Sequence, residues 1–112
     1  MPEIVVVGSF KINPGKEDEA LEAFKALVEP THRENGCVLY ALHQGVDDPA
    51  RLTVIERWES RELLEAHLNS DHVSALLKRA DELWGTNGEI TMYDAVPAGE
   101  PKKGSLAEHA GG

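Results

Sequence analysis

The chain has few cysteines and few basic residues. Its single cysteine, Cys37, cannot form an internal disulfide, which is typical of a protein in a reducing compartment. Eleven Lys and Arg stand against 20 Asp and Glu, so the net charge is −9. A surface this negative repels the phosphate backbone of nucleic acids and anionic lipid headgroups. We therefore expect a cytoplasmic protein that binds neither nucleic acid nor membrane.

Long apolar runs and several common motifs are also missing. No stretch approaches the roughly 20 apolar residues of a membrane helix, and Met1-Pro2-Glu3 leads directly into strand-like sequence, so no secretory leader is expected there. The GxGxxG, Walker and GxSxG motifs do not occur, so the usual signals for dinucleotide, phosphate-loop and α/β-hydrolase sites are lacking. The length of 112 residues predicts a single domain.

Hydrophobic periodicity divides residues 1–96 into four strands and two helical regions. Strands are expected at residues 4–12, 38–44, 51–58 and 89–96. One helix is expected from residue 16 or 17 to Glu34-Asn35-Gly36, and a second from Ser60 to Trp84 with a break at residues 69–71. Pro30 is expected to kink the first helix or end it early. The order β-α-β-β-α-β predicts an α+β fold, the ferredoxin-like split βαβ plan with a four-stranded antiparallel sheet and both helices on one face.

The sheet face opposite the helices predicts an assembly. Apolar side chains from the first two strands should lie there, namely Leu39 and Ala41 with either Val5 and Val7 or their opposite set. Contiguous apolar patches are rare on monomers, so we expect a homodimer packed sheet to sheet. Residues 97–112 change abruptly to Pro, Gly, Lys, Glu and Ala and are expected to form a flexible tail.

Two ionisable residues fall on faces that are otherwise apolar. In the strand at 51–58, one face carries Leu52, Val54, Glu56 and Trp58. On the helix after Ser60, the apolar stripe carries Leu64, His67 and Leu68 at positions i, i+3 and i+4. If these two faces pack together, the carboxylate of Glu56, the indole of Trp58 and the imidazole of His67 surround one cavity.

Each of these residues also has a structural interpretation. Glu56 can pair within the fold, because an unpaired buried carboxylate is costly. Trp58 can be a core residue and His67 a core histidine with satisfied hydrogen bonds. His72 follows His67 by five residues, which is not the i, i+4 spacing of helical zinc ligands, so no metal site is expected. His72 can still reach the mouth of the cavity.

Two sets of residues resemble the antibiotic biosynthesis monooxygenase domain, and its quinol monooxygenase-like branch in particular. The first is a strand ending in Pro14-Gly15, followed by Glu34-Asn35-Gly36-Cys37 and Tyr40. The second is more specific: Glu56-Arg57-Trp58-Glu59-Ser60, then Leu64-Glu65-Ala66-His67-Leu68 and Ser70-Asp71-His72. The resemblance covers residues 5 to about 96. It implies a dimeric α+β barrel with one pocket per subunit between sheet and helices.

The resemblance also implies a function. Characterised members oxidise phenolic or quinol-type aromatics with O₂, without flavin, haem or metal. The partners would be a small aromatic substrate and O₂, with no cofactor. His67 would be the base that deprotonates the substrate hydroxyl, with Glu56 as its partner. The remaining candidate substrate-binding residues are aromatic: Trp58, Phe24, Tyr40 and Trp84. Two alternatives stay open, an isomerase or detoxifying enzyme for a small carbonyl metabolite and a non-catalytic binding dimer.

The sequence departs from two branches of the family. Val54 and Leu64 stand where the antibiotic-pathway oxygenases carry an Asn and a Tyr, so that polar set does not carry over. The haem-degrading branch needs an Asn in the first strand and a His in the last helix. This chain has Val6-Val7-Gly8 and Leu76-Leu77 there, so haem is not expected.

Overall fold

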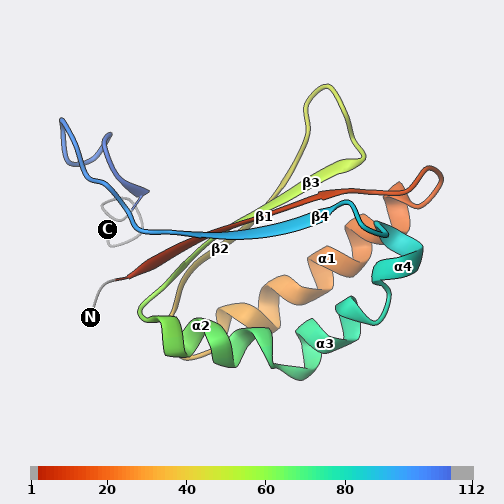
Figure 1. The fold of residues 1–112 in the computed structure, drawn as a ribbon, viewed down its shortest axis with the longest axis horizontal. Coiled ribbons are helices and arrows are strands. Elements are labelled where there is room, and N and C mark those ends of the chain that lie inside the picture. The colour runs from red at the N-terminus through yellow and green to blue at the C-terminus, as the bar shows by residue number, and fades with distance from the viewer. Residues whose placement is uncertain (1–2, 107–112) are drawn as a thin grey trace.

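Four antiparallel strands form one sheet, and all the helices cover the same face of it (Figure 1). The structure is a computed structural model that describes residues 3–106. Its elements are β1 (Ile4–Lys11), α1 (Glu17–His32), β2 (Cys37–Gln44), β3 (Arg51–Trp58), α2 (Arg61–Leu68), α3 (Asp71–Leu77), α4 (Ala80–Leu83) and β4 (Gly88–Tyr93). The strand order is β2-β3-β1-β4. The predicted α+β ferredoxin-like fold is confirmed.

The predicted face of β3 is the one that meets the helices. Leu52, Val54, Glu56 and Trp58 are all buried. Glu56 pairs with Val6 on β1 and with Tyr40 on β2, so its carboxylate stands near the middle of the sheet. A polar side chain at this position points into the core, because alternate residues of a strand face the same side.

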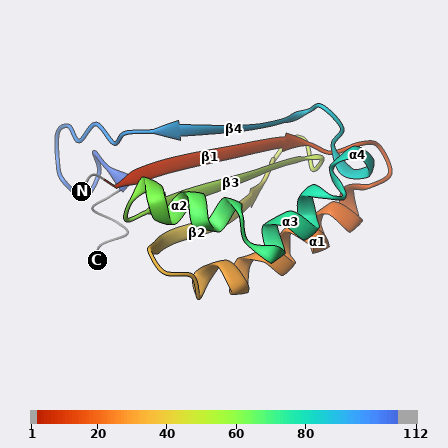
Figure 2. The ribbon, with the colours of Figure 1, turned by 60° about the horizontal axis from the view of Figure 1, so that its bottom comes forward.

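Serine caps set the predicted break between α2 and α3. The hydroxyl of Ser60 accepts a hydrogen bond from the amide of Leu63 at 3.2 Å, and that of Ser70 accepts from the amide of Val73 at 3.4 Å. The structure adds a second break, because α3 ends at Leu77 and the short helix α4 follows. Figure 2 shows α2 and α3 running alongside α1 beneath the sheet.

Two predicted boundaries are wrong. Helix α1 does not end at Pro30 but continues to His32, two residues short of Glu34 in the expected stop; the alternative that Pro30 kinks the helix stays a prediction. Proline in a last turn removes only one amide donor, and the packed face of the helix holds the turn in place. Strand β4 ends at Tyr93 rather than residue 96. The full length of α1 matters for the site, because Glu34 follows the end of this helix and contacts His67 near the end of α2.

The opposite face of the sheet carries apolar side chains from β1 and β2 beside polar and charged ones from all four strands. Val5 is buried there, Leu39 and Ala41 are half-buried, and Arg57 forms an ion pair with Glu3. The homodimer expected from this face stays a prediction, as does the flexibility of the tail. Residues 97–106 include a turn closed by the Glu100 carbonyl, and residues 107–112 lie outside the described residues. Within residues 3–106, no helix has the length and apolar character needed to cross a membrane.

Candidate active site

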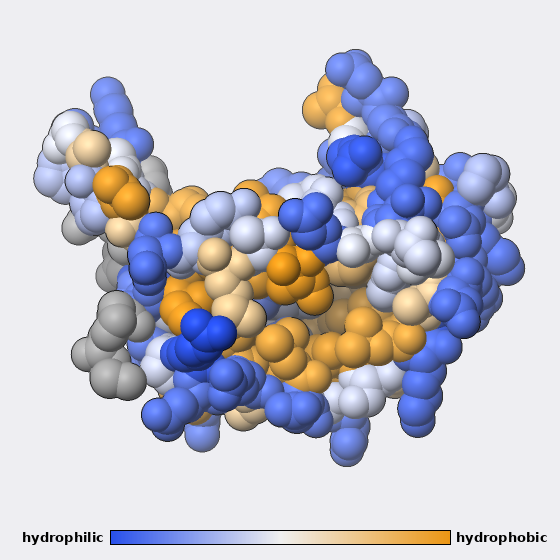
Figure 3. All heavy atoms as spheres, in the orientation of Figure 1, coloured by the Kyte–Doolittle hydropathy of each residue, from blue (hydrophilic) through white to orange (hydrophobic). Residues whose placement is uncertain are grey.

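A cavity lies between the sheet and the helices, as the two facing apolar surfaces predicted. Its lining residues come from every strand and from α1, α2 and α3, with Trp84 after α4: Gly8, Phe10, Phe24, Leu27, Tyr40, Val54, Glu56, His67, Leu68, Val73, Leu76, Leu77, Trp84 and Ile90. Apolar side chains gather around a hollow between β4 and the helices (Figure 3). Leu77 and Ile90 line the cavity and are 48% and 47% exposed, so we place its mouth between them.

The cavity is narrow. Its volume is about 40 Å³, and the hollow counted with the open solvent at its mouth is about 420 Å³. A volume of this size holds about three water molecules, or one molecule of O₂. An aromatic ring enters only if side chains at the mouth move aside.

His67 is held at the inner end of the cavity by a carboxylate. Its side chain is only 3% exposed, and its Nδ1 lies 2.6 Å from Oε2 of Glu34. Since a carboxylate only accepts, Nδ1–H donates, and the lone pair of Nε2 is left facing the other way. Burial lowers the pKa of His67, the Glu34 carboxylate acts in the opposite direction, and His72 lowers it further. The imidazole is therefore neutral, with a free basic nitrogen, around neutral pH.

Glu56 faces the basic nitrogen of His67 across a gap. Its Oε1 lies 3.9 Å from Nε2 of His67, beyond hydrogen-bond length, and accepts a hydrogen bond of 2.9 Å from Nε1–H of Trp58. Burial raises the pKa of Glu56 to about 7; the bond from Trp58 lowers it and the charge of Glu34 raises it. Glu56 thus exchanges its proton close to neutral pH.

Aromatic rings form the other end of the cavity. Phe10, Phe24 and Trp84 contact one another with ring centroids 4.8 to 5.7 Å apart. Tyr40 meets His67 edge-on at 5.5 Å, and burial raises the pKa of Tyr40, so its hydroxyl stays protonated. The cavity is therefore polar at one end and flat-walled and apolar at the other, and its chemistry suits a planar ring bearing one hydroxyl once side chains move to widen it.

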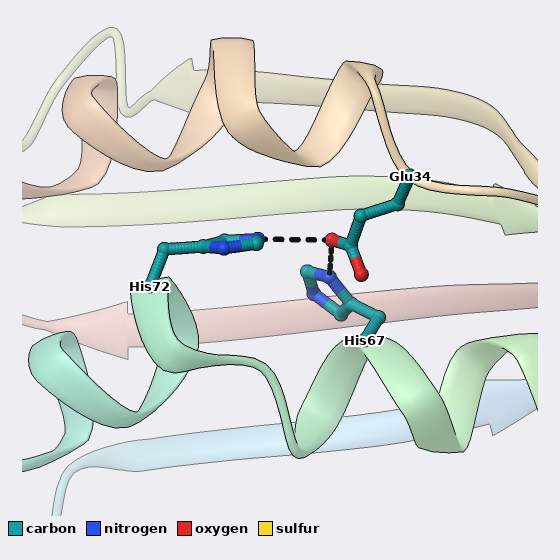
Figure 4. Close-up of side chains that lie close together, drawn as sticks. All are labelled: Glu34, His67 and His72. Carbon is teal, nitrogen blue, oxygen red and sulfur yellow. Dashed lines mark hydrogen bonds and ion pairs between the residues drawn. The ribbon is translucent and has the colours of Figure 1, made fainter.

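The structure brings five of the seven predicted site residues into the lining. These are Glu56, His67, Phe24, Tyr40 and Trp84. Trp58 lies behind the lining, fully buried, with its ring centroid 4.7 Å from that of His67. His72 lies outside the cavity and points at Glu34, with 2.9 Å between Nε2 and Oε2 (Figure 4).

Sequence reasoning missed Glu34 as a site residue. The sequence places it at the end of the first helix, where Glu34-Asn35-Gly36 reads as a helix stop. Nothing in the chain spacing indicates that a residue 33 positions before His67 contacts it. The signal that was present is the segment Glu34 to Cys37, which is among the residues that resemble the family.

The chain matches a known family over most of its length. The family model described as antibiotic biosynthesis monooxygenase matches residues 3–79. A solved structure titled antibiotic biosynthesis monooxygenase is 30% identical, with a TM-score of 0.78, over 84% of this chain and 99% of that one. A solved protein of Pseudomonas aeruginosa is 26% identical, with a TM-score of 0.81, over 86% of this chain and 96% of that one.

A curated relative is longer than this chain. An uncharacterized protein of Synechocystis is 26% identical over 80% of this chain, and the matched part spans 61% of that protein's length. The family assignment therefore rests on the family model, and the two solved structures have the same fold over nearly their whole length.

Proposed function

Because the chain belongs to the antibiotic biosynthesis monooxygenase family, we propose that it oxidises a small phenolic or quinol-type aromatic with O₂ and no cofactor. His67 is the base. The observation that supports this assignment is the hydrogen bond of 2.6 Å from His67 to Glu34, which leaves the second ring nitrogen free at the inner end of an apolar cavity. A neutral imidazole held in this tautomer is suited to remove a proton near pH 7.

The gap between His67 and Glu56 is where the substrate hydroxyl binds in this proposal. An oxygen atom placed about 2 Å to the side of the line that joins Nε2 and Oε1, which are 3.9 Å apart, reaches both within hydrogen-bond distance. Nε2 takes the hydroxyl proton, and protonated Glu56 can donate a hydrogen bond to the resulting phenolate. The ring then extends toward Phe24 and Trp84.

The reaction balances without an external reductant. The phenolate passes one electron to O₂, and the two radicals combine to form a carbon–oxygen bond. Cleavage of the O–O bond leaves one oxygen atom on the ring as a carbonyl and releases the other as water. The substrate supplies both the electrons and the protons, so the protein needs to bind, deprotonate and keep water out. The buried, largely apolar lining meets these needs.

The role of His67 is tested by His67→Ala. With a naphthol or anthrone that the wild-type protein oxidises, we expect O₂ uptake to fall by about 10²–10⁴-fold, the usual contribution of general-base catalysis. The matched control is Glu65→Ala, which truncates an exposed side chain of α2, the helix that carries His67. Equal turnover in both variants would refute the proposal. Product formation that continues without O₂ would instead indicate an isomerase.

We also propose that two copies pair through the open sheet face. Leu39 and Ala41 lie half-buried on this face, and covering them in a partner removes apolar surface from water. Light scattering coupled to size exclusion should give a mass of about twice 12.2 kDa. A monomeric mass at micromolar concentration would contradict this.

A further inference from the structure

Three potential metal-ligating side chains from three different segments converge beside the cavity, on the Nδ1 side of His67, which is the one member of the group that also lines the cavity. Glu34 follows α1, His67 lies on α2 and His72 begins α3. Their nearest ligand atoms, one carboxylate oxygen and two imidazole nitrogens, all lie within 4.8 Å of one another. Figure 4 shows the carboxylate of Glu34 between the two rings. We propose that this group, hereafter the Glu34 cluster, binds a divalent transition-metal ion such as Zn²⁺.

The ligand types select the class of ion. Two imidazoles and one carboxylate suit Zn²⁺, Fe²⁺, Co²⁺, Ni²⁺ and Cu²⁺, whereas Mg²⁺ and Ca²⁺ prefer oxygen ligands throughout. Zinc sites of this composition use three protein ligands and keep a fourth position for water. The chain spacing of His67 and His72 does not match a helical zinc pair, but Glu34 completes the set from another segment.

The distances are close to those that a metal site needs. Around a tetrahedral ion with bonds of about 2.0–2.1 Å, neighbouring ligand atoms lie about 3.3 Å apart. The Glu34 oxygen lies 2.6 Å from Nδ1 of His67 and 2.9 Å from Nε2 of His72. A small outward movement of the carboxylate opens room for the ion between the three atoms.

The Glu34 cluster has an access route and favourable charge. The side chain of His67 is buried, but those of His72 and Glu34 are 24% and 18% exposed, so an ion can approach from the His72 side. The carboxylate of Glu34 brings a negative charge to the cluster, which favours a bound cation. The hydroxyl of Ser70 lies 3.3 Å from Nε2 of His72 and helps to fix that ring.

Metal binding would prevent His67 from acting as a base. An ion on Nδ1 of His67 displaces its proton, and the neutral ring then carries hydrogen on Nε2, the nitrogen that faces Glu56. The lone pair assigned to proton abstraction is lost. This consequence rests on the proposed function, whereas metal binding itself does not. Zinc should therefore inhibit turnover without entering the cavity.

Zinc binding can be measured without any substrate. Untagged protein is treated with EDTA, desalted and titrated with Zn²⁺ by calorimetry, and with Co²⁺ by visible absorption. We expect one site per chain in the wild-type protein and in the control His43→Ala. Affinity should fall at least tenfold in His72→Ala and Glu34→Gln, with circular dichroism verifying that both remain folded.

The outcomes separate the two proposals. Equal zinc affinity in His72→Ala and the wild type, or no binding at micromolar zinc, would overturn the metal site whatever the activity. One-to-one binding that depends on His72, together with loss of O₂ uptake reversed by EDTA, supports both the site and its effect on His67. Binding that leaves O₂ uptake unchanged would refute the inhibitory link and count against His67 as the base.

Discussion

Replacement of Glu34 by glutamine should disable the base while leaving the cavity intact. The carboxylate accepts hydrogen bonds from both His67 and His72. A glutamine amide has the same shape but can donate, so Nδ1 of His67 can accept from it instead. The imidazole proton then resides on Nε2, and the nitrogen facing Glu56 has no lone pair to offer.

The magnitude follows from related chemistry. In a Ser-His-Asp triad, changing the orienting carboxylate to an amide lowers kcat by about 10⁴ for this tautomeric reason, and general-base catalysis as a whole contributes about 10²–10⁴. We expect kcat of Glu34→Gln to fall within that range. KM should change little, because Glu34 does not line the cavity. Since Glu34 raises the pKa of His67, any residual activity should extend to lower pH.

The assay is O₂ uptake across pH with a quinol or naphthol that the wild-type protein oxidises. The matched control is Glu29→Gln, which makes the same change at an exposed glutamate of α1 that forms an ion pair with Arg33. A Glu34→Gln protein with the kcat and pH profile of Glu29→Gln would show that the carboxylate does not orient the base.

Two further predictions concern Glu56 and the mouth. The folded pKa of Glu56 is raised from 4.5 to about 7, so the folded state holds this proton more tightly than the unfolded state, and stability falls as pH rises from about 4.5 to 7. The loss of unfolding free energy is at most on the order of 3 kcal/mol, and Glu56→Gln should remove this pH dependence. The measurement is urea unfolding of both proteins at several pH values. The same change of unfolding free energy with pH in both proteins would contradict this prediction. Leu77→Ala should widen the mouth and so raise the ratio of kcat/KM for two-ring substrates to kcat/KM for one-ring substrates, measured by O₂ uptake. An unchanged ratio would show that the entrance lies elsewhere.

Local patterns determined most of the fold. The alternation in residues 51–58 indicated which face of that strand is buried, and Ser60 and the break at residues 69–71 indicated where two helices begin. These features depend on neighbours within a few residues, so they can be read along the chain. Pro30 shows the limit of such reasoning: its propensity predicts an end, but packing of the helix against β2 and α3 keeps the last turn.

The sequence by itself determined that an acid and an imidazole stand on facing apolar surfaces, because strand and helix periods assign Glu56 and His67 to those surfaces. Only the tertiary structure decided which carboxylate holds the imidazole. Glu34 bonds to His67 on α2 and to His72 on α3, and Glu56 stays 3.9 Å from His67, because the segment after α1 passes beside the junction of α2 and α3. A hydrogen bond depends on angstrom-scale separation between segments, which is set by how the helices pack and is not encoded in any local pattern.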